Sequence, residues 1–109
     1  MNVGIDIVEV RRIHKLIKDK AFMTRVFTDK EIAYCHPKKN RAQHFAVRFA
    51  AKEAVFKSLG SGGVSLKSIG INNLPSGKPE VYIRGKKSRK ISISLSHTTE
   101  YAVAVAIRQ

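Results

Sequence analysis

The sequence is poor in cysteine and has no tryptophan. Cys35 is the only cysteine among 109 residues. A single cysteine excludes an internal disulfide, and no cluster of Cys or His has the spacing of a structural zinc site. We expect Cys35 to pack in the core, because nothing beside it in the sequence would lower its pKa enough to make it a nucleophile.

Long hydrophobic runs are also missing. No stretch reaches the roughly 20 apolar residues of a membrane-spanning helix, and residues 1–7 lack the apolar core and cleavage site of a signal peptide. We therefore expect a cytoplasmic protein with no membrane partner. With 43% hydrophobic residues, we expect residues 1–109 to form a single domain with a modest core.

Acidic residues are scarce. Eight Asp and Glu stand against 21 Lys and Arg, which gives a formal net charge of +13 and a pI near 10.3. This excess favours an anionic partner, because an anion would relieve the repulsion among the cations. Nucleic acid, an acidic protein and a phosphorylated small molecule all meet that description.

The first forty residues predict one strand and two helices. Residues 1–7 alternate in hydrophobicity as a strand does, and the periodicity of residues 8–18 is typical of an amphipathic helix. Thr28 and Glu31 have the spacing of a capping box, so a short helix should begin there and end by Pro37.

A long helix over residues 41–59 and a set of strands make up the rest of the chain. The glycine-rich residues 60–63 should end the helix and form a mobile loop. Four strand-like runs follow, at residues 68–72, 80–84, 90–95 and 101–108. This order predicts an α+β fold, with a mainly antiparallel sheet wrapped on one long helix and preceded by a short strand and a basic helix.

The long helix carries charges among its phenylalanines and alanines. Glu53 and Lys57 are four residues apart, so one interpretation is an ordinary surface ion pair that contributes about 0.3 kcal/mol. The alternative is functional. Ala46 and Ala50 lie one or two turns before Glu53 and are too small to cover it, so its carboxylate would lie in a shallow notch that could hold a ligand.

Asp6 is unusual within a strand. It has a structural interpretation, as the cap of the helix that follows. It also has a functional one, in which Asp6 and Glu53 converge from distant segments and hold Mg²⁺ while Arg48, Lys52 and Lys57 neutralise phosphate oxygens. Magnesium takes one or two carboxylates and fills its other positions with water and substrate phosphate.

The helix over residues 8–18 has a row of cations on its polar side. A charged row is usually just a solvated face. This row has no acidic residue beyond Glu9 to offset the repulsion among its members, so a docking surface for an acidic partner is an equal alternative. Its members are Arg11, Arg12, Lys15 and Lys18.

Four short motifs occur in order along nearly the whole chain. They are VGID at residues 3–6, FAAKEAVFK at 49–57, GKP at 77–79 and SHTTEYA at 96–102. This pattern resembles the signature of the 4′-phosphopantetheinyl transferases. The small size and the FAVRF that begins at residue 45 are similar to the holo-acyl-carrier-protein synthase class of that family. Residues 19–40 carry little of the pattern.

The resemblance implies the 4′-phosphopantetheinyl transferase fold and a Mg²⁺-dependent reaction. In that reaction the phosphopantetheine arm of coenzyme A passes to a serine of apo-acyl carrier protein, 3′,5′-ADP is released, and the product supports fatty acid biosynthesis. The resemblance implies that Asp6 and Glu53 bind the metal and that Lys57 binds phosphate, which makes these three the catalytic residues. The group that takes the serine proton stays open between Glu53 and a water oriented by Asp6.

The same resemblance implies where the substrates bind. His97 would lie beside the coenzyme, and the alternative for this residue is an ordinary turn histidine. The basic row on the first helix would dock the acidic carrier protein, and the chain would form a homotrimer with active sites between subunits. The coenzyme A residues would be Arg48 and Lys57, then Gly77, Lys78 and Pro79 at the adenine, His97 beside the coenzyme, and Lys39 or Arg41 at the 3′-phosphate.

Two other functions compete with this one. Net charge alone would suit a nucleic-acid-binding protein, but no RRM, KH or helix-turn-helix signature is present and the phenylalanines fall mostly on core faces. We therefore expect no nucleic-acid partner. A module that binds carrier protein without chemistry would need the basic helix, but it would have no use for Asp6 and Glu53.

Overall fold

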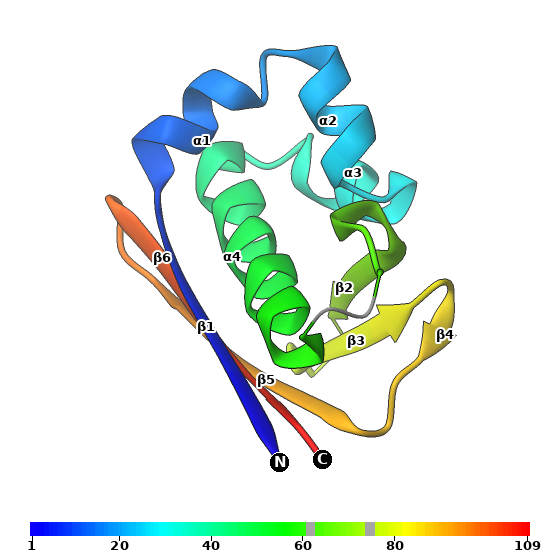
Figure 1. The fold of residues 1–109 in the computed structure, drawn as a ribbon. Helices are drawn as coiled ribbons and strands as arrows, with labels where there is room; N and C mark the ends of the chain where they lie inside the picture. The colour runs from blue at the N-terminus through cyan, green and yellow to red at the C-terminus, as the bar shows by residue number, and fades with distance from the viewer. Residues whose placement is uncertain (61–62, 74–75) are drawn as a thin grey trace.

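The computed structural model describes residues 1–60, 63–73 and 76–109. One strand is followed by four helices and then by a run of antiparallel strands, and the predicted α+β class is confirmed (Figure 1). Within the described ranges, no helix combines the length and apolar character needed to cross a membrane. The elements are β1 (Asn2–Glu9), α1 (Val10–Leu16), α2 (Lys20–Val26), α3 (Asp29–Cys35), α4 (Arg41–Leu59), the 3₁₀ turn η1 (Leu66–Ser68), β2 (Ile69–Asn73), β3 (Pro79–Ile83), β4 (Lys86–Lys87), β5 (Ile91–His97) and β6 (Tyr101–Arg108).

The strands form two three-stranded antiparallel sheets, in the orders β1-β6-β5 and β2-β3-β4. Helix α4 lies across one face of the first sheet, with α1, α2 and α3 grouped toward one end and the second sheet on the other side of the helix (Figure 1). The prediction of a sheet wrapped on one long helix is therefore confirmed.

Strand β1 turns its small and polar side toward α4. Gly4 and Val8 are buried, whereas Val3, Ile5 and Ile7 face outward and are 59%, 60% and 66% exposed. A Cβ atom on Gly4 would lie 1.9 Å from the carbonyl oxygen of Ala54. Only glycine permits so close an approach, and Asp6, on the same side of the strand, is thereby brought to the helix.

Some predicted boundaries at the N-terminal end are wrong. Strand β1 continues to Glu9, and α1 stops at Leu16, so Lys18 lies in the turn that follows. Glu9 occupies the N-cap position of α1 without a side-chain cap. The interpretation of Asp6 as a helix cap is therefore wrong, because Asp6 lies inside the strand.

Three elements were not predicted: the 3₁₀ turn η1, helix α2 and strand β4. Helix α2 has seven residues, too few for a clear periodic signal, and begins where the Asp19 carboxylate accepts from the backbone N–H groups of Ala21 and Phe22. Strand β4 has only two residues. The glycine-rich run that was expected to form a mobile loop falls partly on residues 61–62, outside the described residues; Gly60 does end α4, with φ +69°.

The predicted capping box at Thr28 is confirmed, and it belongs to a larger buried network. The Glu31 N–H donates to Thr28 Oγ1 over 3.2 Å, and the Thr28 N–H donates to Glu31 Oε1 over 2.8 Å. The same carboxylate accepts from Lys52 Nζ at 2.6 Å and from the Ile71 N–H at 2.8 Å. Lys52 also donates to the carbonyl oxygen of Ile69. This ion pair thus satisfies backbone groups of β2 along its free edge.

The expectation that Lys52 neutralises phosphate is wrong. Its side chain and that of Glu31 are fully buried. Burial lowers the pKa of Lys52, and the negative charge of Glu31 opposes that shift. Lys52 is therefore paired inside the protein, where no ligand reaches it.

Cys35 is packed as predicted. It has no solvent exposure and belongs to the core cluster formed between α4, the helices α1 to α3 and the sheets. Burial raises the pKa of its thiol to about 11, against a smaller opposing effect of Arg48. The thiol therefore stays protonated at neutral pH and is no nucleophile.

We expect Glu31→Gln to destabilise the protein by about 3–5 kcal/mol, because it leaves the Lys52 ammonium buried without its counter-charge. Urea unfolding followed by circular dichroism measures the loss. Adding Lys52→Met to the same protein should restore most of the stability, since the unpaired charge is then gone. A double variant as unstable as the single one would contradict this explanation.

Candidate active site

Asp6 and Lys57 meet between β1 and α4. Lys57 Nζ donates to Asp6 Oδ1 over 3.1 Å and to the carbonyl oxygen of Ile5 over 3.0 Å. The Asp6 side chain is 17% exposed and that of Lys57 54%. The interpretation of Glu53 and Lys57 as an ordinary surface ion pair is therefore wrong. Lys57 pairs instead with a carboxylate 51 residues away in the chain.

Glu53 lies one turn before Lys57 on α4 and is half-buried. Its pKa is raised, first by burial and then by the negative charge of Asp6, while the charges of Lys57 and Arg12 oppose the shift. Asp6 and Glu53 are thus close enough to repel each other. The structure thus brings the two carboxylates near each other, and their role as metal ligands stays a prediction.

The two carboxylates suit a magnesium ion. In the described part of the chain, no group of three or more His, Cys, Asp or Glu side chains is placed to hold a metal. A pair of repelling carboxylates beside a lysine instead matches the way Mg²⁺ binds with substrate phosphate, since the ion takes few protein ligands and relieves the repulsion. The residues present therefore fit this ion.

Arg48 anchors a second group of residues on α4. Its buried guanidinium lies 4.3 Å from the ring centroid of Tyr34 and donates to the Asn73 side-chain oxygen. The Asn73 amide in turn donates to the carbonyl oxygen of Gly77 over 3.0 Å. Asn73 thus links two residues that were predicted to bind coenzyme. The sequence held no signal for Asn73 or Tyr34, since their roles depend on contacts between distant segments.

His97 belongs to the same neighbourhood. It lies exposed at the end of β5, and its charge contributes to lowering the pKa of His44, after burial and the charges of Arg48 and Lys38. The Lys38 ammonium lies 4.5 Å from the Tyr34 ring centroid. His44 thus lies near both Arg48 and His97, and sequence reasoning missed His44 and Lys38.

The other predicted coenzyme residues line different hollows. Lys39 and Arg41 border a cavity of about 500 Å³ that also includes Lys18, whereas Arg48 borders one of about 370 Å³. Lys78 and Pro79 border a third, of about 310 Å³. In the part of the chain that the structure describes, these residues do not line a single pocket.

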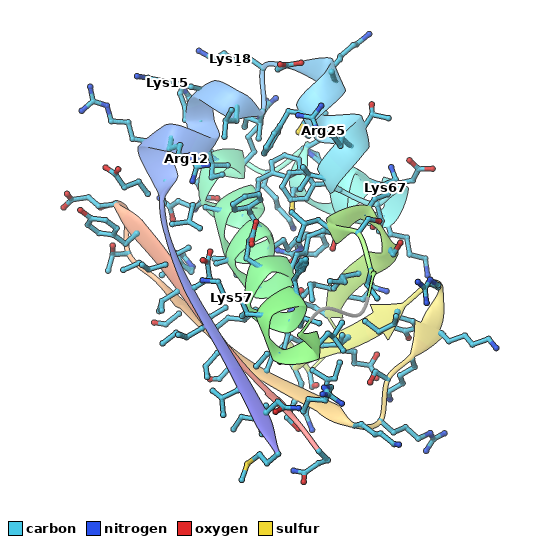
Figure 2. The ribbon with its side chains drawn as sticks, in the orientation of Figure 1. Arg12, Lys15, Lys18, Arg25, Lys57 and Lys67 are labelled. Atoms are coloured by element: carbon cyan, nitrogen blue, oxygen red, sulfur yellow. The ribbon has the colours of Figure 1, made fainter. Side chains whose placement is uncertain are left out.

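The basic row lies at one end of the molecule. Figure 2 shows Arg12, Lys15 and Lys18 there, with Arg25 of α2 nearby, while Lys57 lies further along α4 beside β1. The Arg12 guanidinium lies 5.9 Å from the ring centroid of Phe49, and its charge opposes the rise in the pKa of Glu53. Arg12 therefore connects the basic row to the paired carboxylates.

Comparison with known proteins decides the family. The family model of the 4′-phosphopantetheinyl transferase superfamily matches residues 2–106. The chain belongs to this superfamily. The resemblance inferred from the motifs is confirmed, and with it the enzyme class of phosphopantetheinyl transferase.

Three members of the superfamily show the extent of the similarity. A holo-[acyl-carrier-protein] synthase of Geotalea daltonii is 43% identical over 117 residues, which covers 95% of this chain and 94% of the relative. A crystal structure from Bacillus anthracis, in complex with CoA (3′,5′-ADP), has a TM-score of 0.85 and 35% identity, covering 98% of this chain and 94% of the other. The Helicobacter pylori enzyme in complex with coenzyme A has a TM-score of 0.82 and 30% identity, covering 98% and 99%.

We expect Asp6→Asn to lower the pKa of Glu53, because it removes the negative charge that helps to raise it. NMR titration of the labelled Glu53 carboxyl carbon measures the change. Glu9→Gln, at the end of the same strand, serves as the control and should leave that pKa where it is. An unchanged Glu53 pKa in Asp6→Asn would mean that the two carboxylates are not coupled.

Proposed function

We propose that this enzyme transfers the 4′-phosphopantetheine arm of coenzyme A to a serine hydroxyl of apo-acyl carrier protein and releases 3′,5′-ADP. The observation that carries the proposal is that Asp6 of β1 lies near Glu53 and Lys57 of α4, which are remote from it in the sequence. The names of the relatives and the coenzyme in two related crystal structures support it. We further propose that residues 1–109 act as one domain, which their common core cluster supports.

The reaction requires a cation beside the leaving group. The serine oxygen of the carrier forms a bond to the phosphorus that bears the pantetheine, the bond from that phosphorus to the bridging oxygen breaks, and 3′,5′-ADP leaves with the added negative charge. Lys57 is held by Asp6 and the Ile5 carbonyl and still has half of its side chain exposed. Its ammonium is thus oriented to stabilise the developing charge.

The serine proton needs an acceptor. Glu53 is one candidate, because its raised pKa makes it a stronger base than an ordinary carboxylate. A water oriented by Asp6 is the other. Asp6 and Glu53 would together hold Mg²⁺, which when bound would supply further neutralisation of the diphosphate.

Coenzyme A would bind along the groups that surround these acids. We assign the nucleotide to Arg48 and His97, the adenine to Gly77, Lys78 and Pro79, and the 3′-phosphate to Lys39 or Arg41. Arg48 and Lys38 lie 4.3 Å and 4.5 Å from the Tyr34 ring centroid, so two positive charges gather there, which suits a phosphate. Lys39 and Arg41 line one hollow, and Lys78 and Pro79 line another. We therefore propose that a neighbouring subunit completes the coenzyme pocket.

A homotrimer remains the proposed assembly. The outward row of Val3, Ile5 and Ile7 supports it, because such an exposed apolar row on a strand is typical of a surface that another subunit covers. The acidic carrier protein would dock on Arg11, Arg12, Lys15 and Lys18, where rim charges steer encounter and weaken with salt. A role in fatty acid biosynthesis, a cytoplasmic location and the lack of a nucleic-acid partner stay predictions.

We expect Asp6→Ala and Glu53→Ala each to reduce Mg²⁺-dependent transfer by about 10²–10⁴-fold, in the range of losses of catalytic acids and bases. Mass spectrometry of an apo-carrier protein incubated with coenzyme A and the enzyme detects the added arm. Glu9→Ala, which removes a carboxylate that makes no side-chain cap, is the control. Full activity in either variant would refute the assignment of Asp6 and Glu53. A wild-type protein that binds the carrier protein but transfers nothing to it would favour a binding module.

We expect Asn73→Leu to raise the KM for coenzyme A by about 10-fold, because it removes a hydrogen bond to a charged group and one to the Gly77 turn. The KM for carrier protein should not change. Asn72→Leu is the matched control, since Asn72 borders the same cavity and its side chain makes no hydrogen bond among the described residues. Equal effects of the two substitutions on the coenzyme KM would contradict the role given to Asn73.

A further inference from the structure

A second concentration of positive charge lies on the hairpin formed by β3 and β4. Residues 84–90, which we name the basic hairpin, include five Lys or Arg and no acidic residue. All five cations are exposed to solvent. In Figure 1 this hairpin projects on the opposite side of the molecule from α1. The five are Arg84, Lys86, Lys87, Arg89 and Lys90.

Acidic neighbours offset little of this charge. Lys87 pairs with Glu80 of β3. In the ranges that the structure describes, no other member of the basic hairpin forms an ion pair. The remaining cations repel one another at short range, and an anionic partner would relieve that repulsion.

Protection of a sheet edge accounts for only part of the hairpin. Lysines on an exposed edge strand prevent pairing with other chains, and Lys86 and Lys87 form the edge strand β4. Arg89 and Lys90 lie after that strand, so edge protection does not require them.

Arg84 has a backbone conformation in the turn of the hairpin that is unfavourable for a long side chain. Arg84 has φ +50° and Gly85 has φ +82°. Two successive positive φ angles are typical of a type I′ turn, in which Asn-Gly is preferred and a long side chain is strained. A cation is thus held at the tip where Asn would be more stable, and such a residue is often retained for function.

The composition of the basic hairpin decides which anion it suits. It has no aromatic side chain to stack on a base and no Asn or Gln to read a base edge. An anionic bilayer needs only cations that reach its surface, and each Lys or Arg there strengthens binding about fivefold. Clusters of four to eight Lys or Arg beside a membrane-spanning helix or on an amphipathic helix bind acidic phospholipids, and the basic hairpin has five such residues.

We propose that the basic hairpin binds the surface of an anionic phospholipid bilayer and holds the enzyme there reversibly. This revises the expectation of no membrane partner, which considered only spanning segments. Because α1 lies on the other side of the molecule (Figure 1), a bilayer at the hairpin leaves the basic row of α1 exposed to the solvent.

The test is co-sedimentation of the full chain with vesicles of phosphatidylglycerol and phosphatidylcholine. The wild type should bind these vesicles, bind pure phosphatidylcholine far less, and lose binding as salt rises. The triple variant Arg84→Asn/Lys86→Gln/Lys90→Gln should bind the anionic vesicles about 100-fold less, at about fivefold per cation. Asn suits the left-handed position, so this variant should unfold at the wild-type temperature or higher.

The matched control is Lys20→Gln/Arg25→Gln/Lys30→Gln, which removes the same charge from exposed positions of α2 and α3. It should retain most of the vesicle binding. An equal loss in both triple variants would show that net charge alone matters and would overturn the proposal, as would a wild type that ignores anionic vesicles.

Two further measurements distinguish bilayer binding from nucleic-acid binding and from an effect on the transfer reaction. If the hairpin variant loses binding to a DNA duplex but keeps its binding to vesicles, the surface is for nucleic acid and the proposal is overturned. Transfer of phosphopantetheine to carrier protein in solution should persist in the hairpin variant. Its persistence together with lost vesicle binding supports a surface that is independent of the catalytic site.

Discussion

The close approach of β1 to α4 at Gly4 is the constraint on which the candidate active site depends. Alanines make up the facing surfaces, on β6 as well as on the helix, so strand and helix pack with little between them. Asp6 lies two residues beyond Gly4 on the same side of the strand. It therefore pairs with Lys57, and its charge helps to raise the pKa of Glu53. A larger residue at Gly4 would have to push the strand away from the carbonyl of Ala54, and the carboxylates would separate with it.

The opposite side of α4 is held by the buried pair of Glu31 and Lys52. That pair satisfies backbone groups of β2, and β2 ends at Asn73, which holds both Arg48 and the Gly77 turn. Helix α4 is thus fixed on two sides by contacts of different kinds, close apolar packing on one and a buried charge network on the other. It presents Glu53 and Lys57 toward β1 and Arg48 toward β2. The two proposed parts of the substrate site consequently share one rigid element.

Local signals predicted the local structure well. The bounds of α4 and β6, the capping box at Thr28 and the inertness of Cys35 all agree with the structure, because each depends on residues close together in the chain. Charged residues on α4 were harder to interpret. Periodicity gives the side of a helix that a residue occupies but not the neighbour it meets, so Lys52 was expected at the phosphates and is buried instead. Lys38, rather than the adjacent Lys39, lies beside Arg48 and Tyr34 for the same reason.

By itself, the sequence determined the family, the order of the elements and the residues able to do the chemistry, since motifs and periodicity are properties of the chain. Tertiary structure alone decided the pairing of Lys57 with Asp6, the burial of Lys52, and the link from Arg48 through Asn73 to Gly77. Only the fold, too, turned the apolar row of β1 outward and set the basic hairpin apart from α1. Each of these depends on which distant segments come within a few ångströms, and such distances follow from packing over the whole chain.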